Sequence, residues 1–375
     1  MDRHLGAPAK RKEPFGIVGK DSHLYTAGRS RGRHLESMRG GNRFFSRGFV
    51  NHIYQRPIEA SVLFYSISDY LVYFTILCTQ AAKYNVRILK LCQMPDHIHG
   101  SWVADRKRDL FGLERDITSL FAREHNRVCH RTGPFFQSPF GSTPKYTEKK
   151  ARSNLIYVDN NPVERRLCEQ AEQYRWNYIA YAVSDHPFSE PFRKEEASRP
   201  MIRAVRTVKS WHAAGRHLPY AMLQQMFKPL GRKEREQLVD MIISTYSVID
   251  HEGAIRFFGS YEKMLLADHS TTGSEHDLKE SFLGTDDRWY ARMTTLVMKK
   301  YGLVDIHEML AFSPDRKWDL FQLLRQETMA PADQIAAFLR FPIRREKKKR
   351  QRPSSAGDSG MILPFRPFSP EHPTR

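Results

Sequence analysis

The stretch MPDHIHGSWV, residues 94–103, decides how the middle of this chain folds. Just before it, residues 86–92 read VRILKLC and are a strand candidate. Residues 94–96 favour a turn, because proline and aspartate are frequent turn residues. Residues 97–103 then return as a further strand. The sequence therefore predicts two consecutive strands joined by a tight turn.

The segments on both sides of this pair alternate between strand-like and helix-like patterns. Residues 49–55 alternate apolar with polar side chains, as a half-buried strand does. Ser68 is a candidate cap for a helix that runs to about Tyr84, and helical spacing returns over residues 110–129. Residues 133–140 are predicted to form an edge strand, since their prolines exclude a central one.

A further helix is expected to begin at Thr147 and to end at Asn161, because the residue before Pro162 disfavours helix. The elements then read β-α-β-β-α-β plus a helix. That order is typical of the split βαβ, ferredoxin-like arrangement. We therefore expect an α+β fold with an antiparallel sheet over residues 42–190.

The remaining segments differ in composition from this region. Residues 1–41 and 344–375 are basic with few large apolar side chains, and both are predicted to be disordered tails. Residues 200–343 carry mostly helical patterns and follow a linker around residues 186–200. Residues 334–340 resemble the recognition helix of a helix-turn-helix; the alternative is a helical bundle that only packs.

The charge of the chain is unusual for a globular protein. Its 375 residues hold 60 lysines and arginines against 42 acidic residues, so that the formal net charge is +18 and the pI is near 9.8. Proteins this basic commonly bind a polyanion, most often nucleic acid. The alternative is that basic tails only keep the chain dissolved.

Other features bear on the cellular setting. The N-terminal residues lack an apolar segment, so we expect no signal peptide. The most apolar stretch, residues 70–82, is too short and too polar to cross a bilayer. The four cysteines include no C-x-x-C pair, which argues against a zinc knuckle and favours a reduced, cytoplasmic setting.

His97 and His99 are two residues apart on a predicted strand. Side chains at i and i+2 face the same side of a strand, so both imidazoles project together. That geometry suits one divalent ion, which needs at least one more ligand from elsewhere. The spacing alone is weak support, because two histidines on an exposed strand face also fit it.

Two further strings place this pair in context. The string MPDHIH, residues 94–99, resembles the MP(N/D)HxH signature of HUH-type single-tyrosine transposases, notably the insertion-sequence transposases related to REP-associated tyrosine transposases. YVDNNPV at 157–163 and YRWNY at 174–178 resemble the YIxxNPV and Y-x-W-S-S-Y motifs of that family. The likeness covers about residues 48–181.

The resemblance implies a role for each matching residue. Tyr157 is the implied nucleophile, which attacks a DNA phosphate and leaves a 5′-phosphotyrosine link and a 3′-OH. His97 and His99 are implied to hold Mg²⁺ or Mn²⁺ at that phosphate, with Asn161 as the third protein ligand. The implied partner is single-stranded DNA from the hairpin ends of a mobile element, in the bacterial cytoplasm and nucleoid. Some relatives act as homodimers and others as monomers.

The residue spacing is consistent with these roles. Tyr157 and Asn161 are one helical turn apart, so that they lie on one helix face. A tyrosine hydroxyl, with a pKa of about 10, is a poor nucleophile until it is activated, and a metal that neutralises phosphate charge lowers the barrier. The structural alternatives are a core tyrosine and a helix stop before Pro162. The chain has no P-loop motif, and exchange of one phosphoester for another needs no ATP.

Two positions depart from the family pattern. Asp96 stands where asparagine is commoner, and it either supports a metal ligand or only shapes the turn. Gly100 is small where the family has a larger apolar residue.

Basic side chains near these motifs are candidates for a DNA path. We expect about half of them to contact the phosphate backbone: Arg43, Arg47, Arg56, Lys145, Lys149, Lys150 and Arg152. Interleaved aromatic residues could stack unpaired bases: Phe44, Phe45, Tyr54, Phe136 and Tyr146. Further carboxylates are better explained by a solvated helix face than by a metal site: Asp69, Glu114, Asp116 and Glu124.

Three functions follow from these patterns. The first is a transposase that cuts and rejoins single-stranded DNA by metal-dependent transesterification. The alternative is a domesticated or inactive relative that binds DNA hairpins without cleavage. A more distant one is an RNA-binding ferredoxin-like protein, although the aromatic strings of an RRM are not found.

Overall fold

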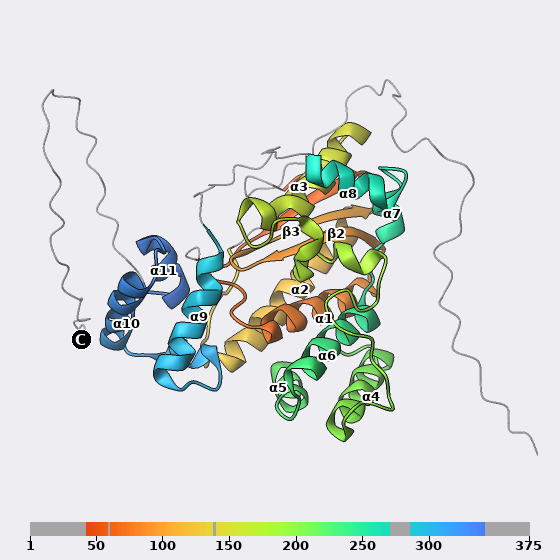
Figure 1. Ribbon diagram of the computed structural model, residues 1–375. Coiled ribbons are helices and arrows are strands. Elements are labelled where there is room, and N and C mark those ends of the chain that lie inside the picture. Colours follow the sequence, from red (N-terminus) through yellow and green to blue (C-terminus); the bar gives the residue numbers. More distant parts are fainter. Residues whose placement is uncertain (1–42, 59–60, 138–139, 271–285, 342–375) are drawn as a thin grey trace, which may run out of the picture.

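The structure is a computed structural model that describes residues 43–58, 61–137, 140–270 and 286–341. The disorder predicted for residues 1–41 and 344–375 concerns segments outside these ranges. The described chain is α+β and mostly helical, with one four-stranded antiparallel sheet (Figure 1), so the predicted class and sheet type are confirmed. None of its described helices combines the length and the apolar character that a bilayer crossing requires.

The sheet has the strand order β2-β3-β1-β4, with every neighbouring pair antiparallel. The strands are β1 (Val50–Gln55), β2 (Val86–Met94), β3 (His97–Ala104) and β4 (Gly141–Lys145). Helix α1 (Ile67–Ala81) connects β1 to β2, and α2 (Lys107–Val128) connects β3 to β4. Helix α3 (Glu148–Glu164) lies on the opposite face of the sheet from α1 and α2 (Figure 1).

Alternation along β3 explains why the sheet has two different faces. Ile98 and Trp102 join the apolar core that contains α1 and α2. Val103 has the opposite parity and packs with Ala151 and Leu155 of α3. The other odd-numbered residues of β3 therefore also face α3: His97, His99 and Ser101.

Three predicted boundaries were wrong. Helix α1 is capped by Ser66 rather than Ser68, because Ser66 and Asp69 form a reciprocal capping box. The last strand lies at 141–145 rather than 133–140, at a sheet edge that tolerates the missing N–H of Pro144. Helix α3 continues through Pro162 to Glu164, since the fixed φ of proline is helical and only one backbone hydrogen bond is lost.

The helices that follow surround the sheet on several sides (Figure 1). Helices α4 (Arg199–Ala213), α5 (Tyr220–Phe227) and α6 (Arg232–Tyr246) share the apolar core of α1. Helices α7 (His251–Ile255) and α8 (Tyr261–Ser270) lie near α3. Short 3-10 turns η2 to η4 connect α3 to α4: Ala171–Gln173, Arg175–Asn177 and Ile179–Ala182. The domain limits at 42–190 and 200–343 remain predictions.

A second apolar core joins the last helices to the segment before α1. It contains α9 (Arg288–Tyr301), the 3-10 turn η5 (Ile306–Ala311), α10 (Pro314–Glu327) and α11 (Ala332–Leu339), with Val62 and Tyr65. Helices α10 and α11 form the expected helix, turn and helix. Asp333 is the only exposed residue of α11, so this burial does not support a recognition helix that reads DNA.

A buried hydrogen-bond network around Asp69 ties these parts together. Its Oδ2 accepts from the backbone N–H groups of Tyr65 and Ser66, each at 2.8 Å. Its Oδ1 accepts from the Tyr220 hydroxyl of α5 at 2.5 Å and from His307 Nε2 of η5 at 3.0 Å. Asp69 is thus buried, as is Glu114, so the solvated helix face predicted for these two carboxylates was wrong.

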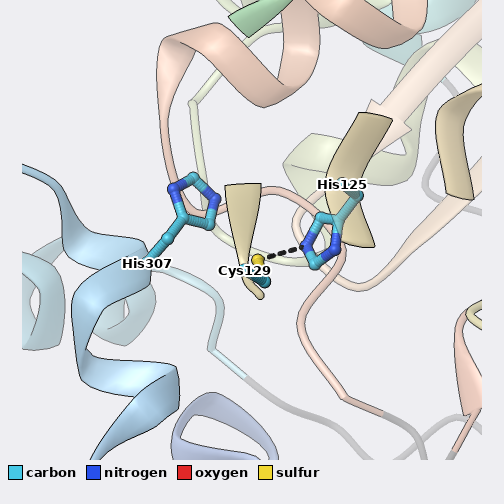
Figure 2. Close-up of side chains that lie close together, drawn as sticks. All are labelled: His125, Cys129 and His307. Atoms are coloured by element: carbon cyan, nitrogen blue, oxygen red, sulfur yellow. Dashed lines mark hydrogen bonds between the residues drawn. The ribbon is translucent and has the colours of Figure 1, made fainter. Parts of the chain in front are cut away.

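His307 also faces His125 and Cys129 at the end of α2 (Figure 2). The potential ligand atoms of these three side chains lie within 4.8 Å of one another. Most of them already have partners: His307 Nδ1 donates to Asp305 Oδ1 at 2.6 Å, and His125 Nε2 accepts from Arg340 Nη2 at 3.1 Å, while His125 Nδ1 has no partner among the described residues. We therefore interpret the cluster as a charged hydrogen-bond network rather than a metal centre.

The charge of His307 is set by its two acidic neighbours. Burial opposes the charged form, but Asp69 and Asp305 outweigh it and raise the pKa of the imidazole to about 10. An unfolded histidine has a pKa of about 6.5. The stabilisation from this pair is therefore complete below pH 6.5 and is lost as the pH rises through 10.

Helix α3 is held to the sheet by a buried ion pair. Lys90 Nζ of β2 lies 2.5 Å from Asp159 Oδ2, and both side chains are almost fully buried. One helical turn earlier, the Ser101 hydroxyl of β3 donates to Asn154 Oδ1 at 2.9 Å. Together these contacts fix the rotation of α3 about its axis, and with it the direction of Tyr157 and Asn161.

Replacing His307 with glutamine should destabilise the protein at pH 6 by a few kcal/mol, because the charged pair with Asp69 is lost. The difference from the wild type should shrink as the pH approaches 10. Urea unfolding between pH 6 and pH 10 measures both, with the exposed His186→Gln as control. A chelator should leave the profile unchanged, and a difference that does not depend on pH would contradict the assigned charge.

Replacing Lys90 with methionine should cost about 3–5 kcal/mol of unfolding free energy, because Asp159 is then buried without its partner. The double variant Lys90→Met, Asp159→Leu should recover most of that loss. Chemical denaturation provides the measurement, and Lys233→Met, which breaks the exposed pair with Glu190, should change little. Equal losses in the single and double variants would show that the ion pair does not anchor α3.

Candidate active site

The histidines of β3 lie beside two aromatic side chains of β1. Tyr54 is the Cα partner of His99, and their rings are 5.1 Å apart between centroids. The ring of His97 is 4.7 Å from that of His99. His52 Nε2 is 3.0 Å from His99 Nδ1, so that a hydrogen bond fixes the orientation of the His99 ring.

Helix α3 brings Tyr157 and Asn161 to the same place. The Tyr157 ring is 5.2 Å from His99 and 5.6 Å from His52, edge to face in both cases. Asn161 Oδ1 lies 3.2 Å from His97 Nε2. The four residues that the motifs singled out as nucleophile and metal ligands are therefore neighbours, although their chemical roles remain predictions.

Asp96 supports His97 from the side away from Asn161. Its Oδ1 accepts from His97 Nδ1 at 2.6 Å, and its Oδ2 accepts from Arg165 Nη2 at 3.1 Å. Burial works to raise the pKa of Asp96, but His97 and Arg165 outweigh it and hold that pKa below its usual range. Arg165 also bonds Asp287, the residue before α9. Asp96 therefore does more than shape the turn.

The donor set fits a divalent cation. His97 Nδ1 is bonded to Asp96, and Nε2 lies 3.2 Å from Asn161 Oδ1, so that in neutral His97 the Nε2 lone pair and this oxygen would both be available to a cation. Two ligands of an octahedral ion at about 2.1 Å are themselves about 3 Å apart. Burial, together with His97 and His52, holds the pKa of His99 well below its usual value. His99 is therefore neutral, as a metal ligand must be.

The candidate site is closed to solvent in this structure. Tyr157 and His97 are each 4% exposed, and His99 is fully buried. Tyr157 packs in a small apolar cluster with Cys92 and Met94 of β2. A phosphodiester can reach these side chains only after the packing around them opens.

The predicted DNA-contacting residues fall into two groups. Lys149, Lys150 and Arg152 are exposed on the first turns of α3, and Arg47 is exposed beside Asp105. Arg43 and Arg56 are partly buried; the Arg56 guanidinium lies 5.1 Å from the Tyr54 ring. Lys145 is only 1% exposed and does not reach the surface. Whether any of them contacts DNA stays a prediction.

Three residues of the site were not anticipated. His52 was noted only as part of a strand, although its parity with Tyr54 could have placed it on the metal-facing side. Arg165 and Asp287 carry no motif, and they meet only because residues 122 positions apart are brought together by the fold.

Comparison with known proteins adds little. No protein-family model matches the chain, and no curated protein matches it. One solved structure, a REP-associated tyrosine transposase bound to a REP hairpin, is similar over 39% of this chain and 86% of its own. The two share 16% identity with a TM-score of 0.34. At that level the likeness establishes neither the family nor the function of this chain. Any proposal of function must therefore be argued from the residues of the candidate site.

Metal binding can be tested directly. The wild-type chain should bind Mn²⁺, and Asp96→Asn should weaken that binding by about ten-fold, because the support of His97 is lost. His97→Ala should weaken it more, whereas the exposed His186→Ala should not. Electron paramagnetic resonance of unbound Mn²⁺ reports the affinities. If all four chains bind alike, the contact between His97 and Asn161 is an ordinary hydrogen bond from the amide group.

Proposed function

We propose that this protein is a DNA transposase of the HUH type, which cleaves and rejoins single-stranded DNA through Tyr157. The observation that carries the proposal is the meeting of Tyr157 and Asn161 on one helix with His97 and His99 on one strand. A nucleophile beside a set of metal ligands is the arrangement that transesterification at a phosphate requires.

The connectivity of the sheet supports the same proposal. The β-α-β-β-α-β order with strand order β2-β3-β1-β4 is that of a ferredoxin-like sheet. With α1 and α2 on one face, the other face is left for α3 and the site. The surplus of positive charge agrees with a DNA partner.

The chemical step exchanges one phosphoester for another. The Tyr157 hydroxyl releases its proton to solvent and its oxygen attacks the phosphorus. The bond between phosphorus and the 3′ oxygen breaks, and that oxygen takes up a proton, which leaves a 3′-OH and a 5′-phosphotyrosine. Bound Mg²⁺ or Mn²⁺ would be held by His97, His99 and Asn161 and would neutralise charge on the phosphate. Asp96 and His52 keep the two imidazoles oriented.

Exposed cations mark the approach to this site. Lys149, Lys150 and Arg152 follow the N-cap Thr147, where the helix dipole adds positive potential. A phosphate backbone arriving there would lead toward Tyr157, two turns further along α3. The binding of unpaired strands is sequence-tolerant and depends strongly on salt.

A second function is favoured by one observation. Tyr157 is 4% exposed, and a tyrosine packed this closely can serve the core instead of attacking DNA. The alternative is therefore a protein that binds DNA hairpins without cleaving them.

Incubation with single-stranded hairpin DNA and Mg²⁺ or Mn²⁺, followed by denaturing electrophoresis, separates the two. The wild type should form a covalent protein–DNA band. That band should be absent from Tyr157→Phe and retained in the control Tyr301→Phe. His97→Ala should abolish cleavage and largely preserve binding, because the metal site is lost while the basic surface remains. If the wild type and all variants bind the hairpins tightly and none forms a covalent band, the result favours a protein that binds hairpins without cleaving them.

A further inference from the structure

A cavity of about 900 Å³ lies on the face of the sheet opposite Tyr157. It is bounded by α2, by the end of β1 and by the residues that flank β4. Its position follows from strand parity, since Tyr54 and Gln55 are consecutive on β1 and point to opposite faces. Tyr54 contacts the two histidines of the candidate site, and Gln55 lines the cavity.

Two residues that line this cavity, Gln55 and Arg43, each hold a buried polar atom with no hydrogen-bond partner among the described residues. Gln55 is 4% exposed; its Nε2 donates to the Gln137 carbonyl at 3.0 Å, while its Oε1 accepts nothing. The Nε of Arg43 is likewise buried without an acceptor. Both atoms are covered by neighbouring protein atoms in this structure, so a ligand in the cavity would complete them only after the two side chains turn toward it.

Aromatic rings stand beside these polar atoms. Phe111 and Phe140 meet edge to face at 5.2 Å, and the Arg43 guanidinium lies 5.8 Å and 5.7 Å from their centroids. Planar aromatic and guanidinium groups are the surfaces on which unpaired bases stack. The polar edge of a base can in turn pair with an amide such as that of Gln55.

The cavity is bordered by positive charge. Lys83, Arg108 and Arg115 line it and are exposed. The acidic lining residue Asp109 is neutralised by Arg106 at 2.8 Å and by Arg108 at 3.8 Å. Arg115 is also paired, with Asp116 at 3.1 Å, but the cations at the opening still outnumber the acids, which suits a phosphate group.

We propose that this cavity binds one unpaired nucleotide of the DNA partner. Its base would lie against Phe111 and Phe140 with its polar edge toward Gln55, and its phosphate would lie on the exposed cations. The choice of DNA rests on the proposed function. Because β1 ends between the two sites, a strand that passes around this end of the sheet would reach both.

The experiment uses the full-length chain carrying Tyr157→Phe, so that no covalent product forms. Fluorescence anisotropy follows the binding of a labelled single-stranded thymidine oligonucleotide and of a duplex of equal length. Gln55→Leu, Phe111→Leu and Arg115→Ala should each weaken single-strand binding, by about ten-fold for the stacking residue, with duplex binding unchanged. Arg123→Ala, an exposed arginine of α2 outside the cavity, is the matched control. Phe111→Tyr keeps the ring and should keep the affinity.

Each other outcome overturns the assignment. Equal losses for single strand and duplex would make the cavity part of a general basic surface. Unchanged affinity in Gln55→Leu and Phe111→Leu, with unfolding midpoints like those of the parent, would show that no base enters. Tighter binding of the matching uridine oligonucleotide, lost in Gln55→Leu, would assign the cavity to RNA.

The hairpin DNA of the cleavage assay, given to the Tyr157 chain with Mn²⁺, keeps the two proposals separate. If no covalent product forms while the cavity variants still weaken binding, the transposase proposal fails and the nucleotide site stands. If covalent product forms and the cavity variants bind normally, the reverse holds.

Discussion

The contact between the Lys90 ammonium and the Asp159 carboxylate is the interaction on which the candidate site depends. The sheet face under α3 carries apolar side chains beside polar ones, so the rotation of α3 about its axis is set by close packing of Ala151 and Leu155 and by polar contacts. A buried ion pair has direction, since either charge without its partner would be strongly destabilised. With Asp159 held down, Tyr157 and Asn161 are also turned toward β3. The direction of the proposed nucleophile thus depends on a residue that the proposed reaction does not use.

Much of the site could be predicted from the sequence because its geometry is local. The parity of a strand places His97 beside His99, and the pitch of a helix places Tyr157 beside Asn161. The prediction that the two pairs meet came from the motifs and not from any spacing. The residues that hold these side chains in place could not be predicted, because they come from distant segments: His52 is 47 residues from His99. The same is true of the buried network outside the site, where Asp69 is 238 residues from His307. No pattern in a single sequence reports such separations.

The same distinction explains the wrong predictions. Asp69 is buried because Tyr220 of α5 and His307 of η5 pack onto it. Glu114 of α2 is buried as well, and its Oε2 has no hydrogen-bond partner among the described residues. The recognition-helix pattern of residues 334–340 stays a prediction, although α11 packs in the second apolar core and Asp333 is its only exposed residue. For Asp69, tertiary packing overrides a local pattern, and the buried carboxylate is stabilised by hydrogen bonds from distant residues.

The chain of contacts from His97 through Asp96 and Arg165 to Asp287 has a consequence for how such a protein can evolve. A substitution at any of these four positions alters the surroundings of the other three. The four residues should therefore be inherited as a set. A homologue with different C-terminal helices would still need an acidic residue that bonds Arg165. Recombination between relatives would then be tolerated at points that keep residues 96, 165 and 287 from one parent.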